Sequence, residues 1–198
     1  MGFEFELKYR ASETVFDAVR QDLPGEAHLL QMQSVYYDTC DGALSARRWT
    51  LRQRLENGQS ICTLKTPGDG IRRQEWEVAS ESIEQGVLEL CKLDCPAEFP
   101  GLIRTGLVPI CGAHFTRIAK TICLDDCTIE LAMDSGELTG GKQKLPLCEL
   151  EVELKSGGEE ACRAFAATLV RQYGLIPEPA SKFQRALALY KGETYGDL

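Results

Sequence analysis

Apolar and polar side chains alternate with a period of two along most of this chain, and a helical period appears in only a few intervals. Alternation of this kind predicts strands with one apolar face and one polar face. The expected strands, in chain order, are 2–10, 32–39, 47–56, 60–66, 72–79, 109–124, 127–134 and 146–155. Asn57-Gly58 is typical of a two-residue hairpin turn, and Pro67-Gly68-Asp69-Gly70 predicts the turn that follows the next strand.

Helical spacing of apolar residues predicts four helical intervals. The first begins at Ser12, whose hydroxyl suits an N-cap, and ends before Pro24-Gly25. Short helical pieces are expected over 80–106, an amphipathic helix over 158–173, and a final helix from Ser181 to Tyr190. These elements predict an α+β fold whose antiparallel sheet closes or nearly closes on itself. We expect one domain over residues 1–198.

The charged residues of each expected strand share one face. In chain order these faces carry Glu4, Glu6, Lys8 and Arg10; Arg48, Thr50, Arg52, Arg54 and Glu56; Thr63 and Lys65; Arg73, Glu75 and Glu77; Glu130, Ala132 and Asp134; and Glu149, Glu151 and Glu153. Each such face could lie against water, as in an ordinary antiparallel sheet, or inside a barrel. A solvent face would mix in Ser, Thr, Gln and Asn, whereas here acids cluster on some strands and bases on others. The joint pattern therefore favours a charged interior.

An interior of this kind predicts a particular ligand, because buried charge without a counter-ion is costly. Arg and Lys bind phosphate oxygens, and carboxylates hold Mg²⁺ or Mn²⁺. The ligand expected in such an interior is a polyanion with a bound divalent cation. The formal charge of −8 argues against broad capture of nucleic acid or anionic lipid.

Cysteine content and hydropathy bear on the compartment. The nine cysteines are odd in number and scattered, without a Cys-x-x-Cys pair, which is typical of a reducing cytoplasmic setting. No apolar run approaches 18 residues, so we expect neither a signal peptide nor a membrane span. The oligomeric state has no signature in the sequence.

Eight ordered motifs resemble one known family. They are Glu4-x-Glu6-x-Lys8, Tyr36-Tyr37-Asp38-Thr39, Leu51-Arg52-Gln53-Arg54, Thr63-Leu64-Lys65, Arg73-Gln74-Glu75-Trp76-Glu77, Ile129-Glu130-Leu131-Ala132-Met133-Asp134-x-Gly136, Cys148-Glu149-Leu150-Glu151-Val152-Glu153-Leu154 and Ser181-Lys182. From residue 3 to about 190 the chain resembles the CYTH family, the triphosphate tunnel metalloenzymes. Within that family it is most similar to bacterial inorganic triphosphatases, some of which carry a C-terminal helical CHAD domain that we do not expect here.

The resemblance implies an eight-stranded antiparallel closed β-barrel with helices outside, and dependence on Mg²⁺ or Mn²⁺. It implies metal-binding positions at Glu4, Glu6, Glu149, Glu151 and Glu153. It implies binding of the triphosphate at Lys8, Arg52, Arg54, Lys65, Arg73, Arg117 and Lys182. Members often have a second basic residue two places after the equivalent of Arg117, where this chain has Ala119; Lys120 has the wrong parity to replace it.

The expected reaction is hydrolysis of inorganic triphosphate to pyrophosphate and phosphate by an attacking water. Glu6 and Lys8 are the expected catalytic residues, with Glu6 positioning or deprotonating the water. Glu4 or a C-terminal glutamate could exchange roles with Glu6. Only one of Tyr36 and Tyr37 can face the interior, because they differ in parity. Thiamine triphosphatase, class IV adenylyl cyclase and a non-catalytic polyphosphate- or nucleotide-binding module remain as alternatives.

Overall fold

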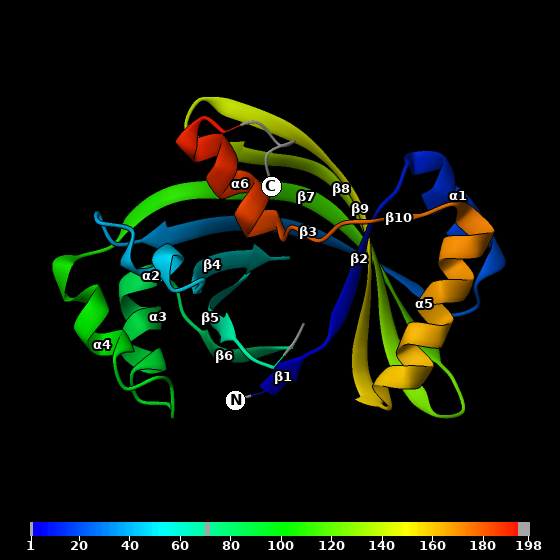
Figure 1. Cartoon of the computed structure of the whole chain (residues 1–198), viewed down its shortest axis with the longest axis horizontal. Helices are drawn as coiled ribbons and strands as arrows, with labels where there is room; N and C mark the ends of the chain where they lie inside the picture. Colours follow the sequence, from blue (N-terminus) through cyan, green and yellow to red (C-terminus); the bar gives the residue numbers. More distant parts are fainter. Residues whose placement is uncertain (1, 70–71, 194–198) are drawn as a thin grey trace.

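The computed structural model of the chain describes residues 2–69 and 72–193, and its elements are labelled in Figure 1. The strands are β1 (Gly2–Glu4), β2 (Glu6–Arg10), β3 (Ala27–Asp38), β4 (Thr50–Glu56), β5 (Gln59–Pro67), β6 (Arg73–Ala79), β7 (Val108–Cys123), β8 (Cys127–Gly140), β9 (Gln143–Gly157) and β10 (Ile176–Pro177). The helices are α1 (Glu13–Asp22), α2 (Ala43–Ala46), α3 (Ile83–Leu90), α4 (Phe99–Leu102), the 3-10 helix η1 (Ile103–Thr105), α5 (Glu159–Tyr173) and α6 (Lys182–Lys191).

The described strands form one ten-stranded antiparallel sheet in the order β1-β6-β5-β4-β3-β7-β8-β9-β2-β10. The expectation of a closed eight-stranded barrel was therefore wrong, because this order is linear, with β1 at one edge and β10 at the other. Phe5 alone separates β1, which pairs with β6, from β2, which pairs with β9. One N-terminal segment thus supplies two strands near opposite ends of a strongly curved, open sheet (Figure 1).

The predicted turns and caps have identifiable local causes. Ser12 accepts a hydrogen bond from the Val15 amide and caps α1, as expected. Asn57 and Gly58 have φ values of 48° and 86°, the left-handed conformation that a two-residue hairpin requires. The turn expected at Pro67-Gly68-Asp69-Gly70 reaches Gly70, which lies outside the described residues.

Two apolar clusters cover the convex face of the sheet. One places α1 and α5 against β2, β8 and β9, with Leu131, Leu150 and Val152 fully buried. The other places α3 and α4 against β4, β5 and β6, where Leu51 and Leu64 are fully buried. These apolar residues alternate with charged residues, so the charged faces point to the concave side, as the parity predicts.

Helix α6 lies on the concave side, so the expectation that the helices lie outside fails for this element (Figure 1). Phe183, Ala186 and Leu189 of α6 pack against Met32 and Tyr36, which belong to the concave face of β3. The ring centroids of Phe183 and Tyr36 are 5.2 Å apart. Among the described residues, we find no helix that combines the length and apolar character needed to cross a bilayer.

Candidate functional site

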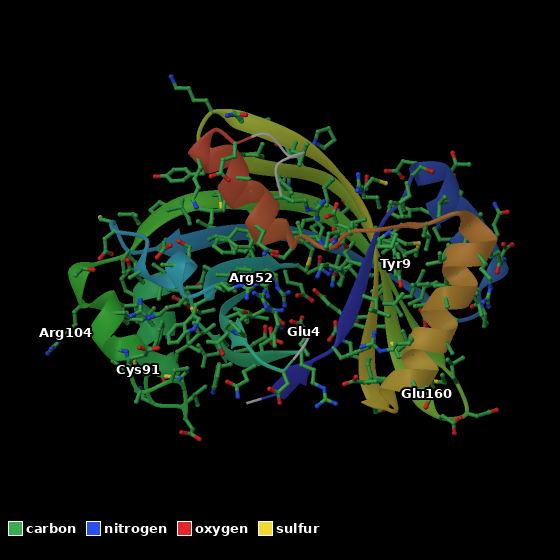
Figure 2. The ribbon with its side chains drawn as sticks, viewed as in Figure 1. Glu4, Tyr9, Arg52, Cys91, Arg104 and Glu160 are labelled. Atoms are coloured by element: carbon green, nitrogen blue, oxygen red, sulfur yellow. The ribbon has the colours of Figure 1, made fainter. Side chains whose placement is uncertain are left out.

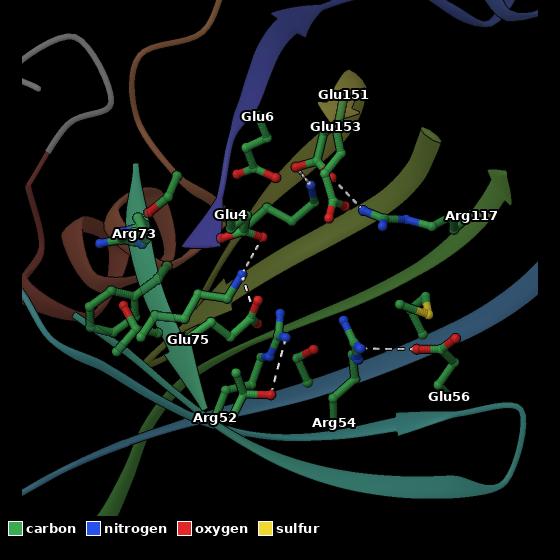
Figure 3. A pocket seen from close by; sticks show the side chains of 18 of the residues that line it. Glu4, Glu6, Arg52, Arg54, Glu56, Arg73, Glu75, Arg117, Glu151 and Glu153 are labelled. Carbon is green, nitrogen blue, oxygen red and sulfur yellow. Dashed lines mark hydrogen bonds and ion pairs between the residues drawn. The ribbon is translucent and has the colours of Figure 1, made fainter. Parts of the chain in front are cut away.

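A charged cavity of about 240 Å³ lies on the concave side of the sheet (Figure 3). Strands β1 to β9 and helix α6 all contribute lining residues. In Figure 2, Glu4 and Arg52 point into this interior, whereas Cys91 and Arg104 lie outside it. The structure brings into the lining most of the residues predicted from sequence: Glu4, Glu6, Lys8, Arg52, Arg54, Lys65, Arg73, Arg117, Glu151, Glu153 and Lys182.

Arg52 and Arg54 form a basic wall on β4. The guanidinium of Arg54 lies 3.1 Å from Glu56, and both arginines reach Glu77 only at 3.8–3.9 Å. The Nε atoms of both are buried and have no hydrogen-bond partner among the described residues. Burial and the charge of Arg52 lower the pKa of the Arg54 guanidinium. This wall therefore has positive charge and donor capacity that an anion would satisfy.

The Lys65 ammonium joins the basic wall to the acidic N-terminal segment. Its Nζ lies 2.5 Å from Glu4 Oε1 and 3.2 Å from Glu75 Oε1. Burial would lower the pKa of Lys65, but Glu4 and Glu75 outweigh it and hold the pKa above its ordinary value. The second oxygen of Glu4, Oε2, is buried and has no hydrogen-bond partner among the described residues. One carboxylate oxygen here is thus open to a cation.

Glu6 lies beside Glu4 on the same face and has a perturbed acidity. Burial raises the pKa of Glu6, and the charges of Glu151 and Glu4 raise it further. Lys8 opposes this effect, with its Nζ 3.3 Å from Glu6 Oε1. Burial also raises the pKa of Glu153, which pairs with Lys155 at 2.8 Å. The carboxylates near the junction of β2 and β9 therefore repel one another, and a divalent cation could neutralise them.

Arg117 lies on β7, and its guanidinium is already paired with carboxylates. Its Nε and Nη2 donate to the two oxygens of Asp134 at 2.8 and 2.7 Å, and Nη2 also lies 2.5 Å from Glu151. Burial would lower the pKa of Arg117, but Asp134 and Glu151 raise it well above its ordinary value. Binding of a phosphate by Arg117 would require one of these ion pairs to loosen.

Lys182 stands at the N-terminus of α6, which the Ser181 and Gln184 side chains cap. Its ammonium lies 2.8 Å from Asp134 and 2.6 Å from Glu151, and it also contacts Glu149. Oxygens of these three acids lie within 4.8 Å of one another, a spacing compatible with a metal. The ammonium already contacts all three, however, so this cluster is neutralised by a side chain.

Glu149 is the one predicted site residue that does not line the cavity. It is fully buried and pairs with Lys182 on one oxygen and Arg185 on the other. Burial and the charge of Glu151 raise the pKa of Glu149 to about 7, against the pull of Lys182 and Arg185. Glu149 is therefore the counter-ion of two α6 side chains, Lys182 and Arg185.

Two questions of parity are answered by the fold. Tyr36 lines the cavity, while Tyr37 packs against the outer cluster with α3 and α4. Lys120 points away from the cavity and donates to the Leu23 carbonyl at the end of α1 at 2.5 Å. Lys120 therefore does not replace the basic residue absent at Ala119, as its parity predicted.

Sequence reasoning missed two charged residues at or beside this cavity, Lys155 and Arg185. Lys155 lines it and bridges Glu153 and Glu130. Residue 155 is the last of the expected strand 146–155 and its parity matches that of Glu151 and Glu153, so the alternation already placed it on the charged face. Arg185 does not line the cavity but pairs with Glu149 beside it, and its position one helical turn after Lys182 is the sequence signal that places both on one face of α6. Arg48 was assigned to the charged face of a strand, but β4 begins only at Thr50.

Comparison with known proteins agrees with this architecture. The model of the CYTH domain matches residues 2–187. A curved antiparallel sheet enclosing opposed acidic and basic walls thus belongs to a recognised class, and the chain is a member of the CYTH domain family.

The relatives include one curated protein and several solved structures. The chain is 29% identical over 194 residues to the inorganic triphosphatase of Haemophilus influenzae, and it spans about half (54%) of that protein's length. The structure of PH1819 from Pyrococcus horikoshii OT3 has a TM-score of 0.63 and 24% identity, covering 95% of this chain and 99% of that one. Hippeastrum HpAC1, whose structure is reported with a dominant triphosphatase activity, has a TM-score of 0.62 and 16% identity, covering 98% and 97%. These two structural likenesses concern the fold.

Proposed function

We propose that this protein hydrolyses inorganic triphosphate to pyrophosphate and phosphate in the charged cavity, with Mg²⁺ or Mn²⁺ as cofactor. The observation that carries the proposal is a set of buried polar atoms without partners on opposite walls. Arg52 Nε and Arg54 Nε lack an acceptor, and Glu4 Oε2 lacks a donor or cation, among the described residues. A triphosphate with its divalent cation satisfies both walls at once.

The basic residues would bind and orient the phosphates. Arg52 and Arg54 offer donors from β4, and Lys65 and Lys8 offer ammonium groups from the neighbouring walls. Arg73, Arg117 and Lys182 complete the proposed set of basic ligands, with the last two held by carboxylates before substrate arrives. Fixed positive charge around the bound triphosphate would stabilise the charge that develops on the leaving pyrophosphate.

The carboxylates of Glu4, Glu6, Glu151 and Glu153 fit a divalent cation. Their mutual repulsion, the raised pKa of Glu6 and the unpartnered oxygen of Glu4 support this assignment. A bound metal would act as a Lewis acid on the phosphate oxygens. We leave Glu149 out of the set, because it does not line the cavity and Lys182 and Arg185 occupy its two oxygens. Arg117 and Lys182 contact the two oxygens of Glu151, so a metal bound there would displace one of these ion pairs.

Glu6 is the proposed group that handles the attacking water. Its carboxyl has a pKa raised by burial, which makes it a stronger base than an exposed glutamate. Lys8, 3.3 Å from Glu6 Oε1, would hold that carboxylate in place and contact the phosphate. Water adds to the terminal phosphorus, the anhydride bond breaks, and the proton passes to Glu6.

A small-molecule substrate in the cytoplasm is part of the proposal. The cavity of about 240 Å³ suits a compact triphosphate, and the nine cysteines, all free, suit a reducing compartment.

A substrate panel tests the proposal. The purified chain is offered inorganic triphosphate, ATP, thiamine triphosphate and long-chain polyphosphate with Mg²⁺, Mn²⁺ or EDTA, while phosphate, pyrophosphate and cyclic AMP are measured. We expect inorganic triphosphate to give the highest kcat/KM and EDTA to abolish turnover. A preference for thiamine triphosphate, or formation of cyclic AMP from ATP, would replace the proposed reaction with another of the same fold. Binding without turnover under every metal would indicate a binding module.

A further inference from the structure

A second cavity, of about 750 Å³, adjoins the charged cavity at the end where β6 begins and α6 starts. The two cavities share five lining residues: Glu6, Lys8, Arg73, Ser181 and Phe183. The two cavities are therefore adjacent, with these side chains between them. Three arginines, Arg48, Arg72 and Arg73, line this second cavity.

Two of these arginines are not neutralised. Arg72 pairs with Glu159 at 2.5 Å. Arg73 donates to the Arg48 backbone carbonyl at 3.4 Å, and neither Arg48 nor Arg73 has a carboxylate within 4.0 Å among the residues that the structure describes. Arg48 and Arg73 thus bring two guanidinium groups without a paired carboxylate to one cavity, whose own carboxylates, Glu6 and Glu178, pair with Lys8 and Arg10. They are a source of local positive potential in a chain of net charge −8.

The backbone of Arg48 indicates that its side chain is there for a reason other than folding. Arg48 follows helix α2 with φ 62°, and its amide donates to the Ser45 carbonyl while the Trp49 amide donates to Leu44. Glycine is the usual residue at this left-handed position after a helix. An arginine there strains the backbone and gains no carboxylate partner among the described residues, so the fold alone does not account for it.

We propose that Arg48 and Arg73 form an anion subsite that binds a phosphoryl group beyond the three held in the charged cavity. The ligand class is a linear polyphosphate of four or more phosphates. Arg73 lies at the junction of the two cavities, and Arg48 lies beyond it in the second cavity only. The subsite rests on the proposed function, since it extends the same phosphate path.

The test compares inorganic triphosphate with linear tetraphosphate and longer polyphosphate. Arg48→Gly removes the side chain while relieving the left-handed backbone, so the variant is expected to fold at least as well as the parent. The matched control is Arg47→Ala: Arg47 lies next in the chain, pairs with Glu98 at 3.6 Å and lines neither cavity. Affinities are measured by calorimetry in EDTA, where no turnover is expected, and kcat/KM with Mg²⁺ is measured for each chain length.

Arg48→Gly should weaken binding of tetraphosphate and longer chains about tenfold and change triphosphate affinity less than twofold, because only the longer chains reach the subsite. Arg47→Ala should change neither. Equal effects on all chain lengths, no effect on any, or the same effect from Arg47→Ala would overturn the subsite. Binding measured in EDTA tests the subsite separately from the proposed hydrolysis. A difference in affinity between triphosphate and longer chains can be present or absent whether or not the protein hydrolyses triphosphate.

Discussion

At the residue scale, the cavity is defined by charged side chains whose partners are incomplete. Glu4 uses one oxygen on Lys65, and Arg52 donates from Nη2 to Thr63 at 3.4 Å while its Nε remains unpartnered. Incomplete pairing of buried charge costs stability, and natural proteins accept that cost mainly at functional sites.

Glu6→Gln should lower kcat for triphosphate by about 100-fold or more while changing substrate affinity little, because the amide cannot accept a proton from water. Steady-state kinetics, with affinity for triphosphate measured separately by calorimetry, give the two quantities. Glu81→Gln is the matched control, since Glu81 is exposed and lines neither cavity. A loss of affinity with kcat preserved would assign Glu6 to binding.

Arg52→Ala should weaken binding of triphosphate by about 10- to 100-fold, the contribution of hydrogen bonds to a charged group. Calorimetric titration with triphosphate measures the change, and circular dichroism checks that β4 is intact. Unchanged affinity in a folded variant would remove Arg52 from the phosphate wall.

The loss of activity at low pH, the acid limb of the pH–rate profile, should follow protonation of the Glu6 carboxylate. Because burial raises its pKa above 4.5, the carboxylate form is lost at a higher pH than for an exposed glutamate as the pH falls. Activity should therefore decline about tenfold per pH unit below that pKa. A metal bound nearby favours the carboxylate, so kcat/KM measured at increasing Mg²⁺ should show the limb moving to lower pH. A limb that is independent of Mg²⁺ would contradict the placement of the metal beside Glu6.

At the element scale, α6 closes the concave side and carries Lys182 into it. Arg185, on the same helix, contacts Glu149 and lies 3.9 Å from Glu178, which also pairs with Arg10 at 3.4 Å. Asp134, Glu149 and Arg185 are almost completely buried. This network fixes the helix by charge where its apolar face meets β3, β7 and β8.

Arg185→Met should lower the free energy of unfolding by about 3–5 kcal/mol, because it removes one of the two cations that pair with the buried Glu149 carboxylate. Chemical denaturation measures the change, and Arg171→Met, at an exposed position of α5, serves as control. A change below 1 kcal/mol would show that Lys182 alone neutralises Glu149.

Element boundaries were predictable where alternation is uninterrupted and failed where it breaks. Strand β8 was expected to end at residue 134, but it runs to Gly140. Ser135-Gly136 reads as a turn, yet a Cβ at Gly136 would come within 2.3 Å of the His114 carbonyl, so this glycine permits a close strand contact. The first residues of β3 are exposed and pair only with β7, so they lack the alternation that marks residues 32–38.

At the scale of the whole molecule, parity predicted which side chains face the cavity but could not predict how the sheet ends. A period of two assigns each residue to a face, and apolar packing then decides which face is concave. The sheet is open because the N-terminal segment is interrupted at Phe5: β1, before it, pairs with β6, and β2, after it, pairs with β9. The inner position of α6 and the burial of Glu149 depend on tertiary packing of segments far apart in the sequence, which local pattern does not encode.

Metal-dependent hydrolysis is tested by measuring phosphate release from inorganic triphosphate by this chain alone, in Mg²⁺ or Mn²⁺ and in EDTA, for the parent protein and Glu4→Gln. We expect metal-dependent turnover in the parent. In Glu4→Gln we expect a higher metal concentration for half-maximal rate, because the open Glu4 oxygen is a proposed metal ligand. Turnover that persists in EDTA, or a metal requirement unchanged by Glu4→Gln, would contradict this expectation.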